Sequence, residues 1–84
     1  MEERFIGIGK ESARRYVEGL GIELTEELEA KCIDASWNWF VADMCDDYSR
    51  TLGEQGAIRK SMVEYLVGLG ADPTKVAEMT RYRA

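Results

Sequence analysis

The sequence predicts a small all-α domain of four helices, and three observations lead to this prediction. Residues 16–25, YVEGLGIELT, and residues 65–74, YLVGLGADPT, share Tyr, Gly-Leu-Gly and Thr in one register. Apolar residues outside these segments recur at helical spacing, and residues 25–52 contain neither Gly nor Pro. We therefore expect a single domain of residues 1–84 with four helices, at about residues 10–20, 25–51, 55–69 and 73–82.

Each repeated segment has the residues of a helix end followed by those of a helix start. Gly accepts the left-handed backbone that commonly follows a helix, so the two Gly-Leu-Gly triplets predict two interhelical corners. Thr25 and Asp72 can cap the helices that follow, Pro73 suits a first turn, and Ser12 can cap the first helix. The similarity reflects either an internal duplication or, as we favour, independent use of the same capping residues.

The helix expected at residues 25–51 has apolar residues on two sides, and Gly53 and Gly56 are expected to end it. Its first stripe consists of Leu28, Cys32, Ala35 and Trp39. Its second, nearly opposite stripe consists of Ile33, Trp37, Phe40, Met44 and Tyr48. A helix that is apolar on both sides is either central in its own bundle or shared with a partner. A homodimer is therefore one of two open interpretations, with candidate self-interface residues Trp37, Phe40, Met44, Val63 and Val67.

The amino-terminal segment RFIGIGK, residues 4–10, is compatible with a short strand or with a segment that packs over the bundle, and we expect the second. Its glycines do not have the spacing of a phosphate-binding loop, because Gly7 and Gly9 are only two positions apart and Glu11 follows Lys10. Nucleotide binding is therefore not expected.

The residue types present argue against catalysis. The chain has no histidine, which removes the commonest general base and zinc ligand. Its two cysteines, Cys32 and Cys45, are too few for a structural zinc site. Placed on one helix they would lie roughly 20 Å apart, too far for a disulfide. We expect two reduced thiols, no cofactor, no metal and no enzymatic activity.

The charge is uneven along the chain. The net charge is −5, and residues 1–54 contain thirteen acidic and six basic side chains, whereas residues 55–84 contain three and five. An acidic body repels nucleic acid, so direct nucleic-acid binding is not expected. No apolar run is long enough to span a membrane and the start does not resemble a secretory signal, so we expect a cytoplasmic protein without membrane association.

Three carboxylates, Asp43, Asp46 and Asp47, would share one face of the long helix beside Trp39. The simplest interpretation is a solvated face on which Asp46 pairs with Arg50. The second is a patch that binds a basic partner, with Asp43, Asp46, Asp47 and Trp39 as its residues. A metal site or acid–base chemistry is the third, and the sequence shows no converging ligands for it.

We therefore expect a small acidic protein that binds and regulates or inhibits another protein with a basic surface. In size and charge it is similar to small inhibitors from phages and other mobile elements. The alternative is a dimeric DNA-binding regulator, because GADPTKVAEMTRYRA resembles the first helix of a helix-turn-helix unit. In its variant form that alternative would use the C-terminal helix pair, with residues 57–69 as the supporting helix and residues 73–82 as the DNA-reading helix that presents Lys75, Arg81 and Arg83.

Overall fold

The amino-terminal segment is helical rather than extended. In the computed structural model, which describes residues 2–81, helix α1 spans Glu3–Leu20. Ser12 lies inside this helix and therefore does not cap it, and Glu2 at the N-cap position makes no side-chain capping bond. Phe5, Gly9 and Ala13 are buried at four-residue intervals, which is the spacing of one helix face. The prediction of a helix starting near residue 10 was wrong, because the helix begins at Glu3 and includes Gly7 and Gly9.

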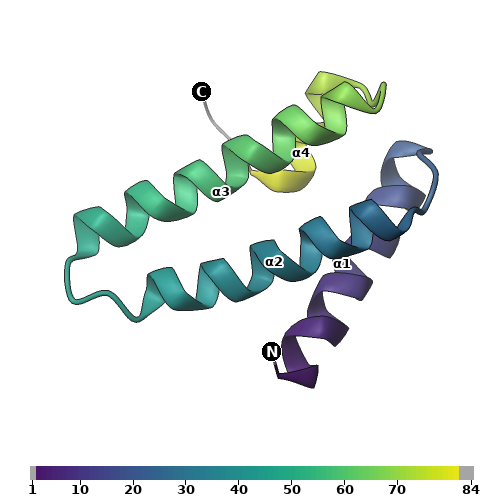
Figure 1. Ribbon diagram of the computed structural model, residues 1–84. Coiled ribbons are helices and arrows are strands. Elements are labelled where there is room, and N and C mark those ends of the chain that lie inside the picture. Colours follow the sequence, from purple (N-terminus) through teal and green to yellow (C-terminus); the bar gives the residue numbers. More distant parts are fainter. Residues whose placement is uncertain (1, 82–84) are drawn as a thin grey trace.

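Three further helices follow, α2 at Glu26–Asp43, α3 at Tyr48–Gly68 and α4 at Pro73–Thr80. Helices α2 and α3 run antiparallel side by side, α1 crosses α2, and α4 folds back along α3 (Figure 1). Helix α4 also contacts α1, so the four helices form a ring. Residues 2–81 contain no strand, which confirms the predicted all-α four-helix domain. The molecule measures 38 × 31 × 15 Å, about two helix layers in its thinnest direction.

Both Gly-Leu-Gly corners are confirmed. Gly21 and Gly70 have φ values of 67° and 95°, the left-handed region in which a side chain is disfavoured. Thr25 caps α2 by accepting a hydrogen bond from a backbone N–H, and Asp72 caps α4 in the same way. Pro73 is the first residue of α4. The sequence therefore identified the chemistry at both ends of these two corners.

The predicted helix over residues 25–51 is instead two helices, and this prediction was wrong. Helix α2 ends at Asp43, and α3 begins after Asp47, whose carboxylate accepts a hydrogen bond from the Arg50 N–H at 3.3 Å. Gly53 and Gly56 lie inside α3 and do not end a helix. The chain turns where an aspartate can cap a new helix, and a pattern based on Gly and Pro alone does not detect this turn.

Two polar side chains of α3 hold this turn against α2. The hydroxyl of Thr51 donates to the Ala42 carbonyl oxygen at 2.8 Å. The amide of Gln55 donates to the Asp43 carboxylate at 2.7 Å. Both side chains are buried, so losing either bond would leave a buried polar group unsatisfied.

The core lies where α2, α3 and α4 meet α1. Leu28, Leu66 and Val76 are its largest fully buried side chains. The buried apolar cluster consists of Ala13, Leu28, Cys32, Met62, Leu66, Ala71 and Val76. Leu28, Cys32 and Ala35 of the first apolar stripe lie in or against this cluster, whereas Trp39 of the same stripe is half-buried outside it.

The second stripe of α2 faces α1, and the two helices approach unusually closely there. A methyl group at Gly9 would lie 2.5 Å from the Cα of Ile33, closer than real side-chain contacts. The Ser36 hydroxyl lies 3.1 Å from the Phe5 carbonyl oxygen and links the same two helices. The Phe5 ring contacts Trp37 edge-on, with 5.3 Å between centroids, and also contacts Phe40. The amino-terminal half of α1 thus covers most of this stripe.

The close crossing predicts that Gly9→Ala destabilises the fold. The added methyl group must push α1 away from the backbone of Ile33, so we expect a loss of about 1–3 kcal/mol in the free energy of unfolding. Gly7→Ala is the matched control, because no atom lies within 4 Å of its added methyl group. We expect Gly7→Ala to stabilise the protein by up to about 1 kcal/mol through helix propensity. Urea denaturation measures the free energy of unfolding of both variants. Equal changes in the two variants would contradict the close crossing of α1 and α2.

Because α3 includes Gly53 and Gly56, we predict that Gly53→Ala and Gly56→Ala stabilise the protein. Both glycines are in a helix interior, and neither added methyl group has an atom within 4 Å. Each substitution should raise the free energy of unfolding by about 0.5–1 kcal/mol. Thermal denaturation followed by circular dichroism measures the gain. If residues 53–56 formed a break between helices instead, neither variant would gain helix propensity.

Candidate functional site

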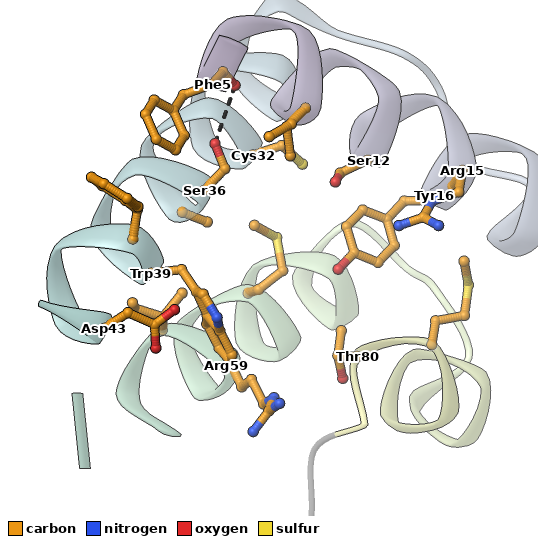
Figure 2. A pocket seen from close by; sticks show the side chains of 16 residues that line it. Phe5, Ser12, Arg15, Tyr16, Cys32, Ser36, Trp39, Asp43, Arg59 and Thr80 are labelled. Carbon is orange, nitrogen blue, oxygen red and sulfur yellow. Dashed lines mark hydrogen bonds between the residues drawn. The ribbon is translucent and has the colours of Figure 1, made fainter. Parts of the chain in front are cut away.

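An open groove runs across the middle of the helix ring (Figure 2). Its volume is about 530 Å³, within the range of pockets that bind ligands. Helix α2 forms the floor, α1 and α3 form the walls, and α4 closes one end. The apolar side chains that line it are Phe5, Ile8, Tyr16, Cys32, Ala35, Trp39, Phe40, Ile58, Met62 and Met79.

Two arginines stand on opposite walls of this groove. Arg15 comes from α1 and Arg59 from α3, and the Arg59 guanidinium lies 4.6 Å from the centre of the Trp39 ring. Within residues 2–81, no carboxylate approaches either guanidinium closely enough to form an ion pair. Asp43 also lines the groove, but its carboxylate accepts the Gln55 hydrogen bond. With two guanidinium groups and one carboxylate, the lining of the groove carries a net positive charge on a protein of net charge −5.

Cys32 and Tyr16 are ionisable groups in the floor and wall of the groove. Burial, together with a smaller effect of the nearby Glu29 carboxylate, raises the pKa of the Cys32 thiol from 9.0 to about 11. Burial likewise raises the pKa of Tyr16. The unfolded chain loses the Cys32 proton at lower pH than the folded chain. Stability from this neutral thiol is therefore present below pH 9.0 and lost as the pH rises toward about 11. A protonated thiol is a poor nucleophile.

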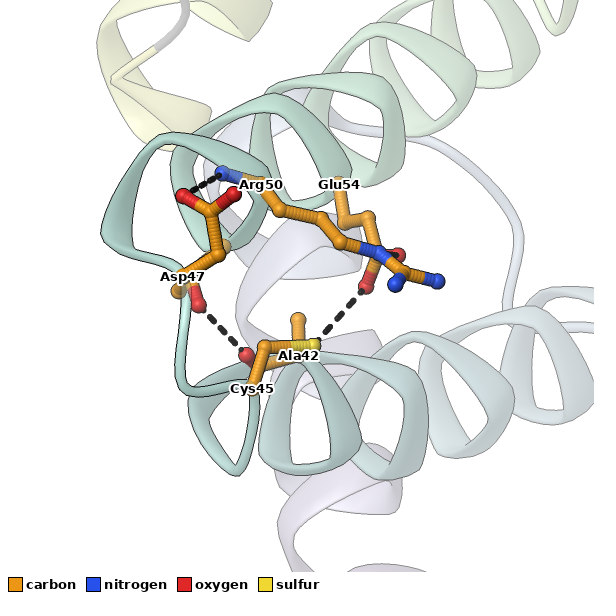
Figure 3. Close-up of polar contacts among 6 residues, drawn as sticks. Ala42, Cys45, Asp47, Arg50 and Glu54 are labelled. Atoms are coloured by element: carbon orange, nitrogen blue, oxygen red, sulfur yellow. Dashed lines mark hydrogen bonds and ion pairs between the residues drawn. The ribbon is translucent and has the colours of Figure 1, made fainter.

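The three aspartates singled out in the sequence do not lie on one helix face. Asp43 ends α2, Asp46 lies in the turn, and Asp47 caps α3. The predicted Asp46–Arg50 pair is wrong, because Arg50 instead pairs with Glu54, with 3.1 Å between Nε and Oε1 (Figure 3). Residues 2–81 contain no group of three carboxylate or thiol side chains that could share a metal ion.

The same turn exposes large apolar side chains. Tyr48 is 74% exposed, Met44 60% and Leu52 51%. We call this end of the molecule, residues 41–52, the acidic tip. It combines exposed apolar area with the charges of Asp43, Asp46 and Asp47, and Arg50 is its one basic side chain. Trp39 is outside the tip, half-buried in the floor of the groove that Asp43 also lines.

The candidate self-interface residues are spread over the molecule. Trp37 and Phe40 are half-buried against Phe5, and Val63 is half-buried against the core. Met44 and Val67 are exposed. Self-association through these five residues stays a prediction.

The basic residues of the DNA-binding alternative also have defined places, with one exception. Lys75 and Arg81 are exposed, on α4 and directly after it, whereas Arg83 lies outside the described residues. Among residues 2–81, no helix has the length and apolar character needed to cross a bilayer.

Comparison with known proteins finds no matching family model, no matching curated protein and no matching solved structure. The function therefore has to be inferred from the groove and the acidic tip themselves.

Sequence reasoning missed the groove and part of the tip. Ile8, Arg15 and Arg59 fall on the groove walls, and Leu52 falls on the tip. Recognising that α1 begins at residue 3 would have placed Phe5, Ile8, Ser12 and Arg15 on one stripe at helical spacing. Arg59 carried no comparable signal, because its position opposite Arg15 depends on how α3 packs.

The different surroundings of the two thiols predict selective alkylation. Iodoacetamide at pH 8 should modify Cys45, which is half-buried near the surface, and leave Cys32 unmodified, since Cys32 is buried and protonated. Mass spectrometry after proteolysis measures the modified fraction at each site. In urea both thiols should react at similar rates, which serves as the control. Rapid modification of Cys32 in the native protein would contradict the packing of the groove floor.

Proposed function

We propose that this protein acts by binding another protein, without catalysis, and regulates or inhibits that partner. The acidic tip is the contact surface in this proposal. The observation that supports it is the exposure of Met44, Tyr48 and Leu52 at one end of the molecule beside three carboxylates. Aromatic residues and Met concentrate in the buried cores of interfaces. An exposed group of this kind on a small domain is typical of a binding site.

The charge of the tip selects the chemistry of the partner. The tip, residues 41–52, contains three acidic side chains, Asp43, Asp46 and Asp47, and one basic side chain, Arg50, which is paired with Glu54 just outside the tip. The resulting field attracts a basic surface and speeds its encounter with the tip. A partner with a basic, partly apolar surface, such as a nucleic-acid-binding protein, has this chemistry. The proposal includes the cytoplasmic location expected from the sequence.

The partner can be identified by crosslinking from the tip itself. A photoreactive benzoylphenylalanine replaces Tyr48 in one variant and the exposed Lys75, on α4, in a control variant. In cells that make the protein naturally, irradiation should yield a discrete adduct with a basic protein from position 48 only. Identical adducts from both positions would contradict a specific contact at the tip.

Removing the charge of the tip tests its role in binding. The variant Asp43→Asn, Asp46→Asn and Asp47→Asn keeps acceptor oxygens for Gln55 and for the cap of α3, because Asn is also a good N-cap. We expect little change in stability, an affinity for the crosslinked partner reduced about tenfold, and a weaker dependence on salt. The matched control removes three exposed charges elsewhere, by Glu18→Gln, Glu23→Gln and Glu27→Gln.

Calorimetric titration of the partner at two salt concentrations compares the two triple variants. Equal losses of affinity in the two triple variants would show that only the net charge of the protein matters. If neither variant lost affinity, the acidic tip would not be part of the interface. Tight, salt-sensitive binding of nonspecific duplex DNA in a shift assay would favour the alternative of a DNA-binding regulator instead.

A further inference from the structure

The groove has the shape left when part of a helix is missing from a four-helix bundle. Helix α4 has 8 residues and α3 has 21, so their lengths are about 12 and 31 Å. Helix α4 therefore closes the ring along less than half of α3. Along the remaining length, α1 and α3 face each other across α2 with no fourth helix between them. The open length of about 19 Å accommodates a helix of roughly 12 residues.

The two walls present stripes that a helix could contact. On α1 the groove residues Phe5, Ile8, Ser12 and Arg15 follow one another at intervals of three and four. On α3 the groove residues are Ile58, Arg59 and Met62, at intervals of one and three. Ile8 is 46% exposed on its wall although it faces the middle of the molecule. An apolar helix face laid between the walls would cover these side chains.

The charges of the walls indicate which charges a bound helix should carry on its two flanks. Arg15 and Arg59 stand on opposite walls, and neither has a carboxylate partner within residues 2–81. Arg15 lies beside Met79 of α4, where the open length ends, so a helix in the groove would meet the Arg15 guanidinium near the end of one flank and the Arg59 guanidinium on the other flank. Carboxylates on both flanks would form the ion pairs that the chain itself does not supply, as charged residues beside the apolar seam do in coiled coils.

We propose that the groove binds an amphipathic helix of a partner protein, about three turns long, whose apolar stripe has acidic residues on both sides. This proposal rests on the groove and does not depend on the exposed apolar side chains of the acidic tip, which meets the groove only at Asp43. A second copy of this chain fits less well, because the outward faces of α1 and α2 are polar or mixed in charge. The large apolar side chains that it exposes outside the groove do not form one helical stripe three turns long. They are spread over α2, α3 and the connecting segments: Leu24, Val41, Met44, Tyr48, Leu52, Val67 and Leu69.

Two synthetic helical peptides test the proposal. Both have 14 residues and the same stripe of leucines, and they differ only in carrying Glu or Lys on both flanks. Each is labelled with fluorescein, and its affinity for the full-length protein is measured by fluorescence anisotropy. We expect the Glu peptide to bind at least about tenfold more tightly than the Lys peptide, with the difference decreasing as salt rises.

Charge reversal on the walls gives the decisive comparison. The double variant Arg15→Glu, Arg59→Glu should reverse the preference and bind the Lys peptide more tightly. Arg14→Glu is the matched control, since Arg14 is exposed on α1 but does not line the groove, and it should keep the preference for Glu. Ile8→Gln should lower the affinity for both peptides by about the same factor. Circular dichroism shows whether each variant is folded.

Three results would overturn the proposal. The first is equal binding of both peptides to the parent protein, or no binding of either. The second is an unchanged preference in the double charge-reversal variant. The third is a dimer in sedimentation velocity that Ile8→Gln dissociates, because the groove would then hold a second copy of this chain.

Discussion

The close contact between Gly9 of α1 and Ile33 of α2 is the constraint on which the arrangement of the other helices depends. Because one position lacks a side chain, the two backbones approach until Phe5 reaches Trp37 and Phe40. The Ser36 hydroxyl, at 3.1 Å from the Phe5 carbonyl oxygen, links the helices one turn away. Small residues allow such approaches, and the cost of any added atom makes the geometry specific.

This crossing also determines where the groove lies. With its amino-terminal half held against the second stripe of α2, α1 can contribute only one edge, including Ile8 and Arg15, to the opposite side of α2. Helix α3 packs on the other edge of α2, and α4 is too short to cover the space between α1 and α3 along its whole length. The positions of the cationic groove and of the acidic tip therefore both follow from the way α1 and α3 pack against different sides of α2.

The sequence was informative where local chemistry determines the backbone. Gly21, Gly70, Thr25 and Asp72 have the conformations and caps expected of them, because these depend on a few adjacent residues. The sequence was misleading at glycines, because a glycine can either belong to an irregular segment or allow two helices to pack closely. Gly9 permits a close crossing, whereas a pattern of glycines alone suggests an irregular segment.

The candidate site was harder to predict than the helices. The turn at residues 44–47 depends on the cap at Asp47 and on hydrogen bonds from Thr51 and Gln55, residues that the sequence alone gives no reason to bury. Asp46 and Met44 were identified from the sequence, but on a helix rather than in a turn. The opposition of Arg15 and Arg59 depends on tertiary packing between segments 44 residues apart in the sequence.

The hydrogen bonds around the acidic tip also affect how easily the first turns of α3 open. In the first half of α3 the buried side chains are Thr51 and Gln55, and buried apolar residues begin only at Met62. Polar bonds contribute less to net stability than buried apolar area, and a segment of this kind opens locally at a lower free energy than the core. The first turns of α3 should therefore exchange their amide hydrogens through local opening, while those around Leu66 exchange only when the whole domain unfolds. A partner that contacts the tip can reshape it at little energetic cost to the rest of the domain.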